Sequence, residues 1–193
     1  MNPWFAKTGI LLGSTAIVVI RVMYRLRCRN VVVVKNRMGR LEVALMAFAS
    51  IGFVVPLLWV ASSVFEIADY SLHPVPFISG ILCLVLGLLL FVWSHMALGT
   101  NWSVTLKVQE GHELVTRGIY CCVRHPMYLA LMLYSVGQAL VVPNWVAGPS
   151  CGIAMTILFA LRMGVEERMM LEHFGKDYEE YVTRTKRLVP GIW

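Results

Sequence analysis

Long apolar runs constrain what this chain can fold into more than any other feature of its sequence. The runs cover residues 4–20, 43–65, 77–98, 127–142 and 145–161. The first three are each long enough to cross a hydrocarbon core about 30 Å thick, since a helix rises about 1.5 Å per residue. Hydrophobic residues make up 58% of the chain and charged residues 15%, against about 45–50% and about 25% in soluble domains. The sequence therefore predicts an all-α integral membrane protein with five transmembrane helices.

The two shorter runs are separated only by Pro143-Asn144, which is a turn signal. We expect them to form a helical hairpin that crosses where the bilayer is thin or where the protein covers it. A re-entrant pair of helices is the alternative.

Charged residues between the runs predict the orientation of the helices. The first connection carries basic residues and no acidic one: Arg21, Arg25, Arg27, Arg29, Lys35, Arg37 and Arg40. Because cytoplasmic loops are enriched in Lys and Arg, this connection is expected inside, where it also suits contact with anionic membrane lipids. Alternation then places segment 99–126 and the tail after Arg162 on the same side.

The chain divides into two parts on this scheme. Residues 1–97 hold the first three helices. Residues 98–193 hold a polar loop, the helical hairpin and an amphipathic tail that is predicted to be helical to about residue 185. Apolar and polar residues alternate over 104–109, which predicts a short extended pair around a turn at Gly111. Most informative polar residues lie after residue 97, so this part is the predicted catalytic region.

One polar cluster is Arg124-His125-Pro126-Met127-Tyr128. Proline suits the first position of a helix, because its missing N–H would have no partner there. A helix beginning at Pro126 carries a partial positive charge, which Arg124 and His125 reinforce. This arrangement suits a small carboxylate or phosphate. A basic flank that only sets topology explains the same residues.

A second cluster, at the end of the hairpin, contains Arg162, Glu166 and Glu167. Arg162 and Glu166 are four residues apart and so share one helix face. The hairpin should bring this cluster beside the first one, which would suit a zwitterionic ligand or a cation next to a carboxylate. A solvated stripe past the end of the helix is the alternative.

Together these residues resemble the signature of membrane methyltransferases. Arg124-His125-Pro126-x-Tyr128, followed by Glu166-Glu167, is similar to a motif of the isoprenylcysteine carboxyl methyltransferases and the related phospholipid methyltransferases. Gly111-His112-x-Leu114-Val115-Thr116-x-Gly118-x-Tyr120 is similar to the same families, as is the tail over 171–181. The resemblance covers residues 98–192.

The resemblance implies S-adenosylmethionine as cofactor, in a cytoplasm-facing pocket formed by the last two helices, the preceding loop and the tail. The residues implied to bind it are Lys107, Val108, Gln109, His112, Leu114, Val115, Gly118, Tyr120, His125, Pro126, Met127, Tyr128 and Glu167. It also implies catalytic roles for Arg162, Glu166 and Glu167, with Arg162 positioning a substrate carboxylate and a glutamate holding the cofactor's amino group.

The leading hypothesis is therefore an isoprenylcysteine carboxyl O-methyltransferase of the cell membrane or endoplasmic reticulum, acting on a lipid-linked small substrate or a prenylated protein C-terminus. Phospholipid amine N-methylation is the alternative reaction, and a membrane scaffold or transporter is the alternative of another class. A transporter needs ionisable residues at mid-span, and the runs here are almost free of them. The five histidines lack metal-ligand spacing and no nucleic-acid motif is present, so neither a bound metal ion nor a nucleic-acid partner is expected. The oligomeric state stays open.

Overall fold

The computed structural model describes residues 3–28, 33–36, 39–102, 107–109 and 113–189. Its α-helices are α1 (Pro3–Arg27), α2 (Arg40–Ala61), α3 (Pro74–Leu98), α4 (Pro126–Val141), α5 (Ser150–Phe174) and α6 (Lys176–Arg184). Short 3₁₀ helices are η1 (Glu66–Ala68), η2 (Gly99–Asn101) and η3 (Gly118–Cys121), and the strands are β1 (Val33–Asn36) and β2 (Lys107–Gln109). The predicted helical architecture is confirmed.

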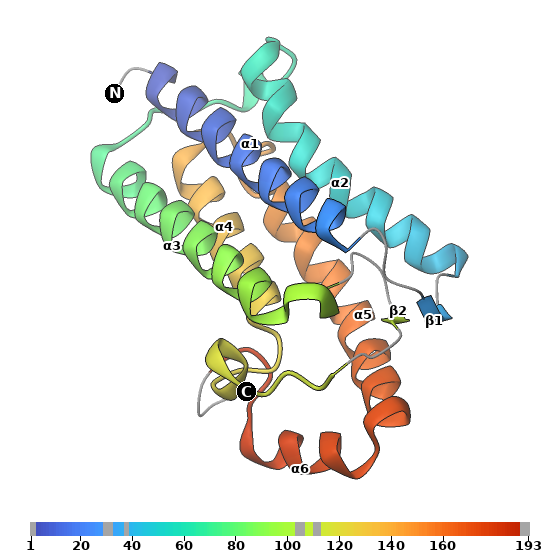
Figure 1. The fold of residues 1–193 in the computed structure, drawn as a ribbon. Helices are drawn as coiled ribbons and strands as arrows, with labels where there is room; N and C mark the ends of the chain where they lie inside the picture. The colour runs from blue at the N-terminus through green and yellow to red at the C-terminus, as the bar shows by residue number, and fades with distance from the viewer. Residues whose placement is uncertain (1–2, 29–32, 37–38, 103–106, 110–112, 190–193) are drawn as a thin grey trace.

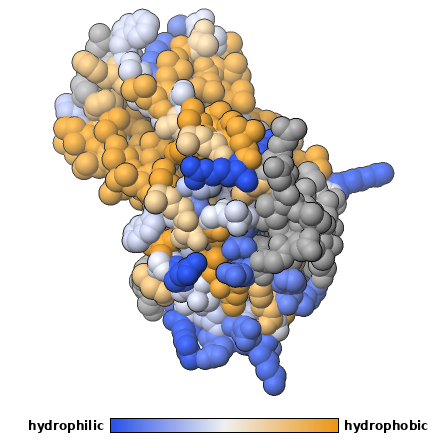
Figure 2. All heavy atoms as spheres, in the orientation of Figure 1, coloured by the Kyte–Doolittle hydropathy of each residue, from blue (hydrophilic) through white to orange (hydrophobic). Residues whose placement is uncertain are grey.

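Helices α1, α2 and α3 are each long and apolar enough to cross a membrane, and α4 is apolar but only 16 residues long. Leu12, Ile78 and Leu89 are among many large apolar side chains exposed on the outer faces of these helices. Figure 2 shows apolar residues over most of the helical bundle and hydrophilic residues gathered at the end where α6 lies. This distribution suits a bundle surrounded by lipid with one polar end. The fourth and fifth crossings stay predictions.

Helices α3 and α4 lie side by side at very short range (Figure 1). Glycines make this possible: a Cβ on Gly137 would stand 2.7 Å from the Leu84 nitrogen, and one on Gly87 would stand 2.9 Å from the Tyr134 nitrogen. Small residues let membrane helices approach closely enough for extensive van der Waals contact. Helix α5 packs against both α2 and α4, so the last two long helices form the predicted hairpin.

The turn of this hairpin is longer than predicted, because α5 begins at Ser150 rather than near residue 145. Asn144 holds the intervening loop together: its Oδ1 accepts from the backbone nitrogens of Val146 (3.0 Å) and Ala147 (2.7 Å). Its Nδ2 donates to the Phe65 carbonyl (2.7 Å) and to Asp69 Oδ1 (2.6 Å). The loop is thereby tied to the connection between α2 and α3, at the end of the bundle away from α6.

At the other end, β2 pairs antiparallel with β1. The prediction of an extended pair within 104–115 is wrong, since the partner of β2 comes from the α1–α2 connection and Leu114 and Val115 lie in no strand. Alternation identifies a strand but not its partner, and the valine run at 31–34 is a stronger strand former than Leu114-Val115. This pairing places the first connection and segment 99–126 together.

Two helix ends also differ from expectation. Helix α1 continues through Arg27 rather than ending near residue 20, since arginine and leucine are good helix formers outside the bilayer core. The tail is two helices rather than one, because Gly175 adopts φ +52° and ends α5. Helix α6 therefore turns beneath the bundle (Figure 1).

Candidate functional site

The start of α4 is held by the C-terminal tail. Pro126 occupies the first turn and His125 is the N-cap residue. The backbone nitrogen of Arg124 donates to the Lys186 carbonyl (2.8 Å), and that of His125 donates to the Arg187 carbonyl (3.0 Å). The tail thus fixes the two basic residues that precede the helix.

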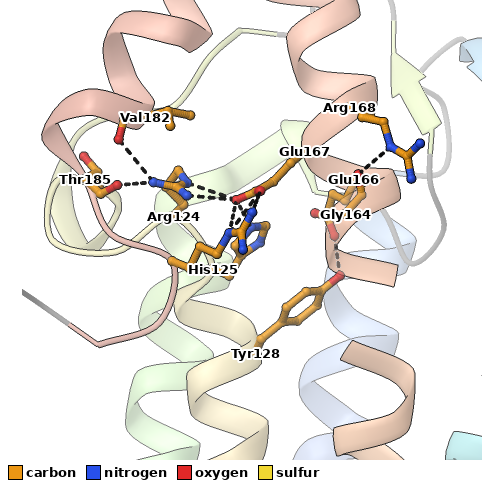
Figure 3. Close-up of polar contacts among 10 residues, drawn as sticks. Arg124, His125, Tyr128, Gly164, Glu166, Glu167, Arg168, Val182 and Thr185 are labelled. Atoms are coloured by element: carbon orange, nitrogen blue, oxygen red, sulfur yellow. Dashed lines mark hydrogen bonds and ion pairs between the residues drawn. The ribbon is translucent and has the colours of Figure 1, made fainter. Parts of the chain in front are cut away.

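Glu167 of α5 lies at the centre of a cluster of basic side chains (Figure 3). Its Oε1 accepts from Arg124 Nη2 (3.0 Å) and His125 Nε2 (3.3 Å), and its Oε2 accepts from Arg187 Nη2 (2.7 Å). The basic helix start was expected to face an anionic ligand. The anion that it faces is instead the Glu167 carboxylate. We call Glu167, Arg124, His125 and Arg187 the ion-pair hub.

The hub controls the charge of Glu167, which lies beyond the predicted membrane crossing. Burial raises the pKa of this carboxyl, but hydrogen bonds from His125, Arg187 and Arg124 outweigh burial and hold the pKa well below its usual range. The side chains of Arg124, His125 and Glu167 are only 8%, 7% and 14% exposed. Glu167 therefore stays ionised throughout the physiological range and joins α5 to the start of α4 and to the tail.

Tyr128 links the first turn of α4 to Glu166. Its hydroxyl donates to Glu166 Oε2. Its ring stacks between those of His125 and Phe159, with centroids 5.2 Å and 4.2 Å away and interplanar angles of 6° and 16°. Stacking on both faces fixes the ring and hence its hydroxyl. Among the described residues, the Glu166 carboxylate takes part in no ion pair.

Arg162 lies one turn before Glu166 on α5 but pairs elsewhere. Its Nε is 3.3 Å from Glu42 Oε1 of α2, and the two side chains are 9% and 7% exposed. Sequence reasoning did not single out Glu42. The available signal was that Glu42 is the only acidic residue within 1–65, next to a strongly basic connection.

A cavity of about 150 Å³ lies between these groups. The predicted site residues that line it are Leu114, Val115, Tyr120, His125, Met127, Tyr128, Arg162 and Glu166. Gly118 and Pro126 position the chain nearby without lining the cavity, and Glu167 belongs to the hub. Lys107, Val108 and Gln109 form β2, and His112 lies outside the described residues.

The tail contributes further cavity residues that were not predicted as site residues. Tyr178 and Tyr181 of α6 are buried against the cavity, as is Met169 near the end of α5. Burial raises the pKa of Tyr178, and the negative charge of Glu167 raises it further, so the phenol remains a protonated donor. Spacing by three residues was the signal that these two tyrosines share a helix face. The amphipathic tail therefore covers the site.

The cavity combines features for ligands of both signs. The aromatic rings of Trp102 and Tyr178 line the cavity and can pack beside a cation, and Glu166 offers a carboxylate. Arg162 offers a guanidinium for an anion. Across the described part of the chain, no three His, Cys, Asp or Glu side chains gather as a metal site would require. A small organic ligand with a positive centre, beside a second anionic one, suits these walls.

Comparison with known protein families helps to identify the cationic and anionic ligands that the cavity suits. The model of the phospholipid methyltransferases matches residues 75–177, which is more than half of the chain. The chain belongs to the phospholipid methyltransferase family. The matched part of the chain runs from α3 into α6 and includes Arg162, Glu166 and Glu167, whereas α1 and α2 precede it.

Named relatives are similar to this chain over a comparable stretch. Protein-S-isoprenylcysteine O-methyltransferase B of Arabidopsis thaliana is 30% identical over 115 residues, which cover 58% of this chain and 58% of the relative. The Homo sapiens protein-S-isoprenylcysteine O-methyltransferase is 29% identical over 117 residues, which cover 60% of this chain and 41% of the relative. The chain thus spans about half the length of these relatives.

A solved structure shows the same fold as this chain. The eukaryotic intramembrane Ras methyltransferase ICMT, an isoprenylcysteine carboxyl methyltransferase, superposes with a TM-score of 0.54 at 24% identity. The match covers 82% of this chain and 55% of the other. It therefore includes part of the α1–α2 region that the family model leaves out. The shared fold and the three helices that are long and apolar enough to cross a membrane support an integral membrane protein.

Proposed function

We propose that this chain is an S-adenosylmethionine-dependent methyltransferase that methylates the carboxylate of an isoprenylated cysteine. The observation that carries the proposal is a cavity in which Glu166 lies beside stacked aromatic rings and Arg162 lies one turn away. Family membership supports methyl transfer, and the names of the relatives support the acceptor. The acceptor can be a lipid-linked small molecule or the C-terminus of a prenylated protein.

The cavity residues fit this cofactor. S-Adenosylmethionine carries a sulfonium and an ammonium group, and when bound it supplies an activated methyl group. Glu166 can pair with the ammonium, and the rings of Trp102 and Tyr178 can pack beside cationic or aromatic parts. Leu114 and Val115 add apolar wall. Glu167 contributes indirectly, because it holds His125 and Arg124 in place.

The acceptor needs no general base. An α-carboxyl group has a pKa of about 3.3–3.7, so it is already an anionic nucleophile at neutral pH. Methyl transfer from a cation to an anion destroys charge, and a water-poor site favours such a step. Leu131, Leu158 and Phe159 provide apolar walls. Arg162 can orient the carboxylate, and its pairing with Glu42 offsets its charge so that the nucleophile is not held too strongly.

Phospholipid N-methylation is the alternative reaction, and the chain's membership of the phospholipid methyltransferase family supports this alternative. An amine must be neutral to attack, and Glu166 could then accept its proton. Arg162 would have no attractive role toward an amine. A scaffold or a transporter would not require the cluster of Glu166, Tyr128 and Arg162.

Replacing Glu166 by Gln tests the cofactor site. We expect Glu166→Gln to weaken S-adenosylmethionine binding about tenfold or more, since a hydrogen bond to a charged group contributes about 1.5–3 kcal/mol. Isothermal titration of the purified chain measures the affinity. Glu179→Gln, on the exposed side of α6, is the matched control and should bind normally. Unchanged affinity of Glu166→Gln with wild-type folding would contradict the assignment.

We further propose that the end of the bundle with α6 faces the cytoplasm, in the cell membrane or the endoplasmic reticulum. The basic connection supports this side, and the β1–β2 pairing keeps that connection with the catalytic segment. Cys121 and Cys122 are exposed at this end, and Trp145 is exposed at the other. A membrane-impermeant maleimide should label the two cysteines only in inside-out vesicles. Trp145→Cys, in a chain with both cysteines changed to Ser, should react only in right-side-out vesicles. The reverse pattern would refute the orientation.

A further inference from the structure

Arg21 lies on the inward-facing stripe of α1. Ile10, Ser14, Ile17 and Tyr24 are buried on this stripe, and Arg21 falls four residues after Ile17 and three before Tyr24. Its side chain is half-buried, whereas the next arginine of the helix, Arg25, is exposed. The stripe directs the charge of Arg21 toward the bundle rather than toward water.

The side chain of Arg21 lines the cavity described above. Its Nε is shielded from solvent and has no hydrogen-bond partner among the described residues. A charged group near the membrane interior is costly unless an anion or an aqueous pocket receives it. An anion at this wall of the cavity would therefore find a donor that the fold leaves without a partner.

The charged groups nearest the cavity do not supply that anion. Repulsion from Arg162 acts on Arg21. Glu42 is paired with Arg162, and Glu167 is taken up by the hub. Glu166 accepts a hydrogen bond from the Tyr128 hydroxyl, and no ion pair between Glu166 and Arg21 is found among the described residues. Glu113 also lines the cavity, and no ion pair joins it to Arg21 among the described residues. Arg21 thus lines the cavity without a countercharge from any described carboxylate.

We propose that Arg21 binds the carboxylate of the methyl acceptor and selects anionic acceptors over neutral ones. This inference rests on the proposed function and deepens it, since it names a specificity residue in a helix that precedes the family match at residues 75–177. Arg162 orients the same carboxylate with a charge that Glu42 offsets. No such countercharge pairs with Arg21 in the described part of the chain, so Arg21 provides the attraction.

The expected effect is on affinity more than on rate. The carboxylate loses its charge as the methyl group is transferred, so Arg21 interacts more strongly with the ground state than with the transition state. An interaction of this kind lowers KM without raising kcat. Arg21→Met should therefore raise the acceptor KM about tenfold or more while kcat stays the same or increases.

The contact between Arg21 and the acceptor carboxylate is tested by removing the charge from each of the two groups in turn. The affinities of S-farnesylated N-acetylcysteine and of its neutral methyl ester are measured for the wild-type chain, Arg21→Met, Arg21→Lys and Arg25→Met. The wild type should bind the acid about tenfold or more tightly than the ester. Arg21→Met should lose this preference, Arg21→Lys should keep part of it, and Arg25→Met should keep all of it.

Two results would overturn the inference. One is an acid preference that survives in folded Arg21→Met. The other is a loss of S-adenosylmethionine affinity in that variant with the acid preference intact, which would assign Arg21 to the cofactor. Failure of the proposed function has a different signature: the wild type transfers no methyl group to the acid, although the binding preference and its dependence on Arg21 are still observed.

Discussion

Arg162→Lys should lower turnover on an isoprenylated cysteine about 100-fold, which is about 2.7 kcal/mol in activation free energy. Lysine keeps the positive charge but loses the planar fork that holds a carboxylate in one orientation. It also loses the Nε that lies 3.3 Å from Glu42. S-Adenosylmethionine affinity should change little, because the charge at that position is retained.

Steady-state kinetics and a cofactor titration on the same preparation measure the two effects separately. Arg168→Lys is the matched control: Arg168 is exposed on the same helix, and its Nε donates to the Gly164 carbonyl (3.2 Å). This variant should be as active as the wild type. If Arg162→Lys retained full turnover on the isoprenylated acid, the carboxylate-positioning role would be refuted.

Glu167→Gln should destabilise the fold by about 3 kcal/mol, the lower end of the range for removing one partner of a buried ion pair. The neutral amide would leave the Arg124 guanidinium buried without this countercharge and would weaken the hydrogen bond that His125 Nε2 makes to Glu167. The lower end of this range applies because the Arg187 side chain of the hub is 40% exposed. Cofactor affinity should fall together with stability, since the hub positions His125 at the cavity.

Thermal or denaturant unfolding in detergent measures the change. Glu180→Gln is the control, because Glu180 and Arg184 form an exposed i,i+4 pair, and such pairs contribute only about 0.3–0.5 kcal/mol. Equal losses in the two variants would show that the hub has no structural role.

The pH dependence of stability follows from the same contacts. Since the pKa of Glu167 is lower in the folded chain than in the unfolded one, the hub contributes stability above the unfolded value of about 4.3. That contribution is lost only as the pH falls through the folded pKa, in strongly acid solution.

Sequence patterns predicted the elements of this fold better than their partners. The apolar runs located the long helices, and Pro126 located the start of α4. The spacing of Arg162 and Glu166 placed them correctly on one face of α5. These features are local, since hydrophobic periodicity and capping depend on neighbours within a few residues.

Contacts between segments that are distant in the chain could not be predicted from local sequence patterns. Glu42 and Arg162 are brought together by the packing of α2 against α5, and the hub depends on the tail returning to the start of α4. Strand β2 was predicted with the wrong partner for the same reason. Arg21 looked like one topological charge among seven because α1 was expected to end before it.

The most direct test of the central claim is a competition for the methyl group. The purified chain is incubated with S-adenosylmethionine labelled in its methyl group, together with S-farnesylated N-acetylcysteine and phosphatidylethanolamine, and the products are identified by mass spectrometry. We predict that the label appears as a methyl ester of the cysteine derivative and is released by mild base. Label on the amine of phosphatidylethanolamine instead, or no transfer to either acceptor, would contradict the proposed function.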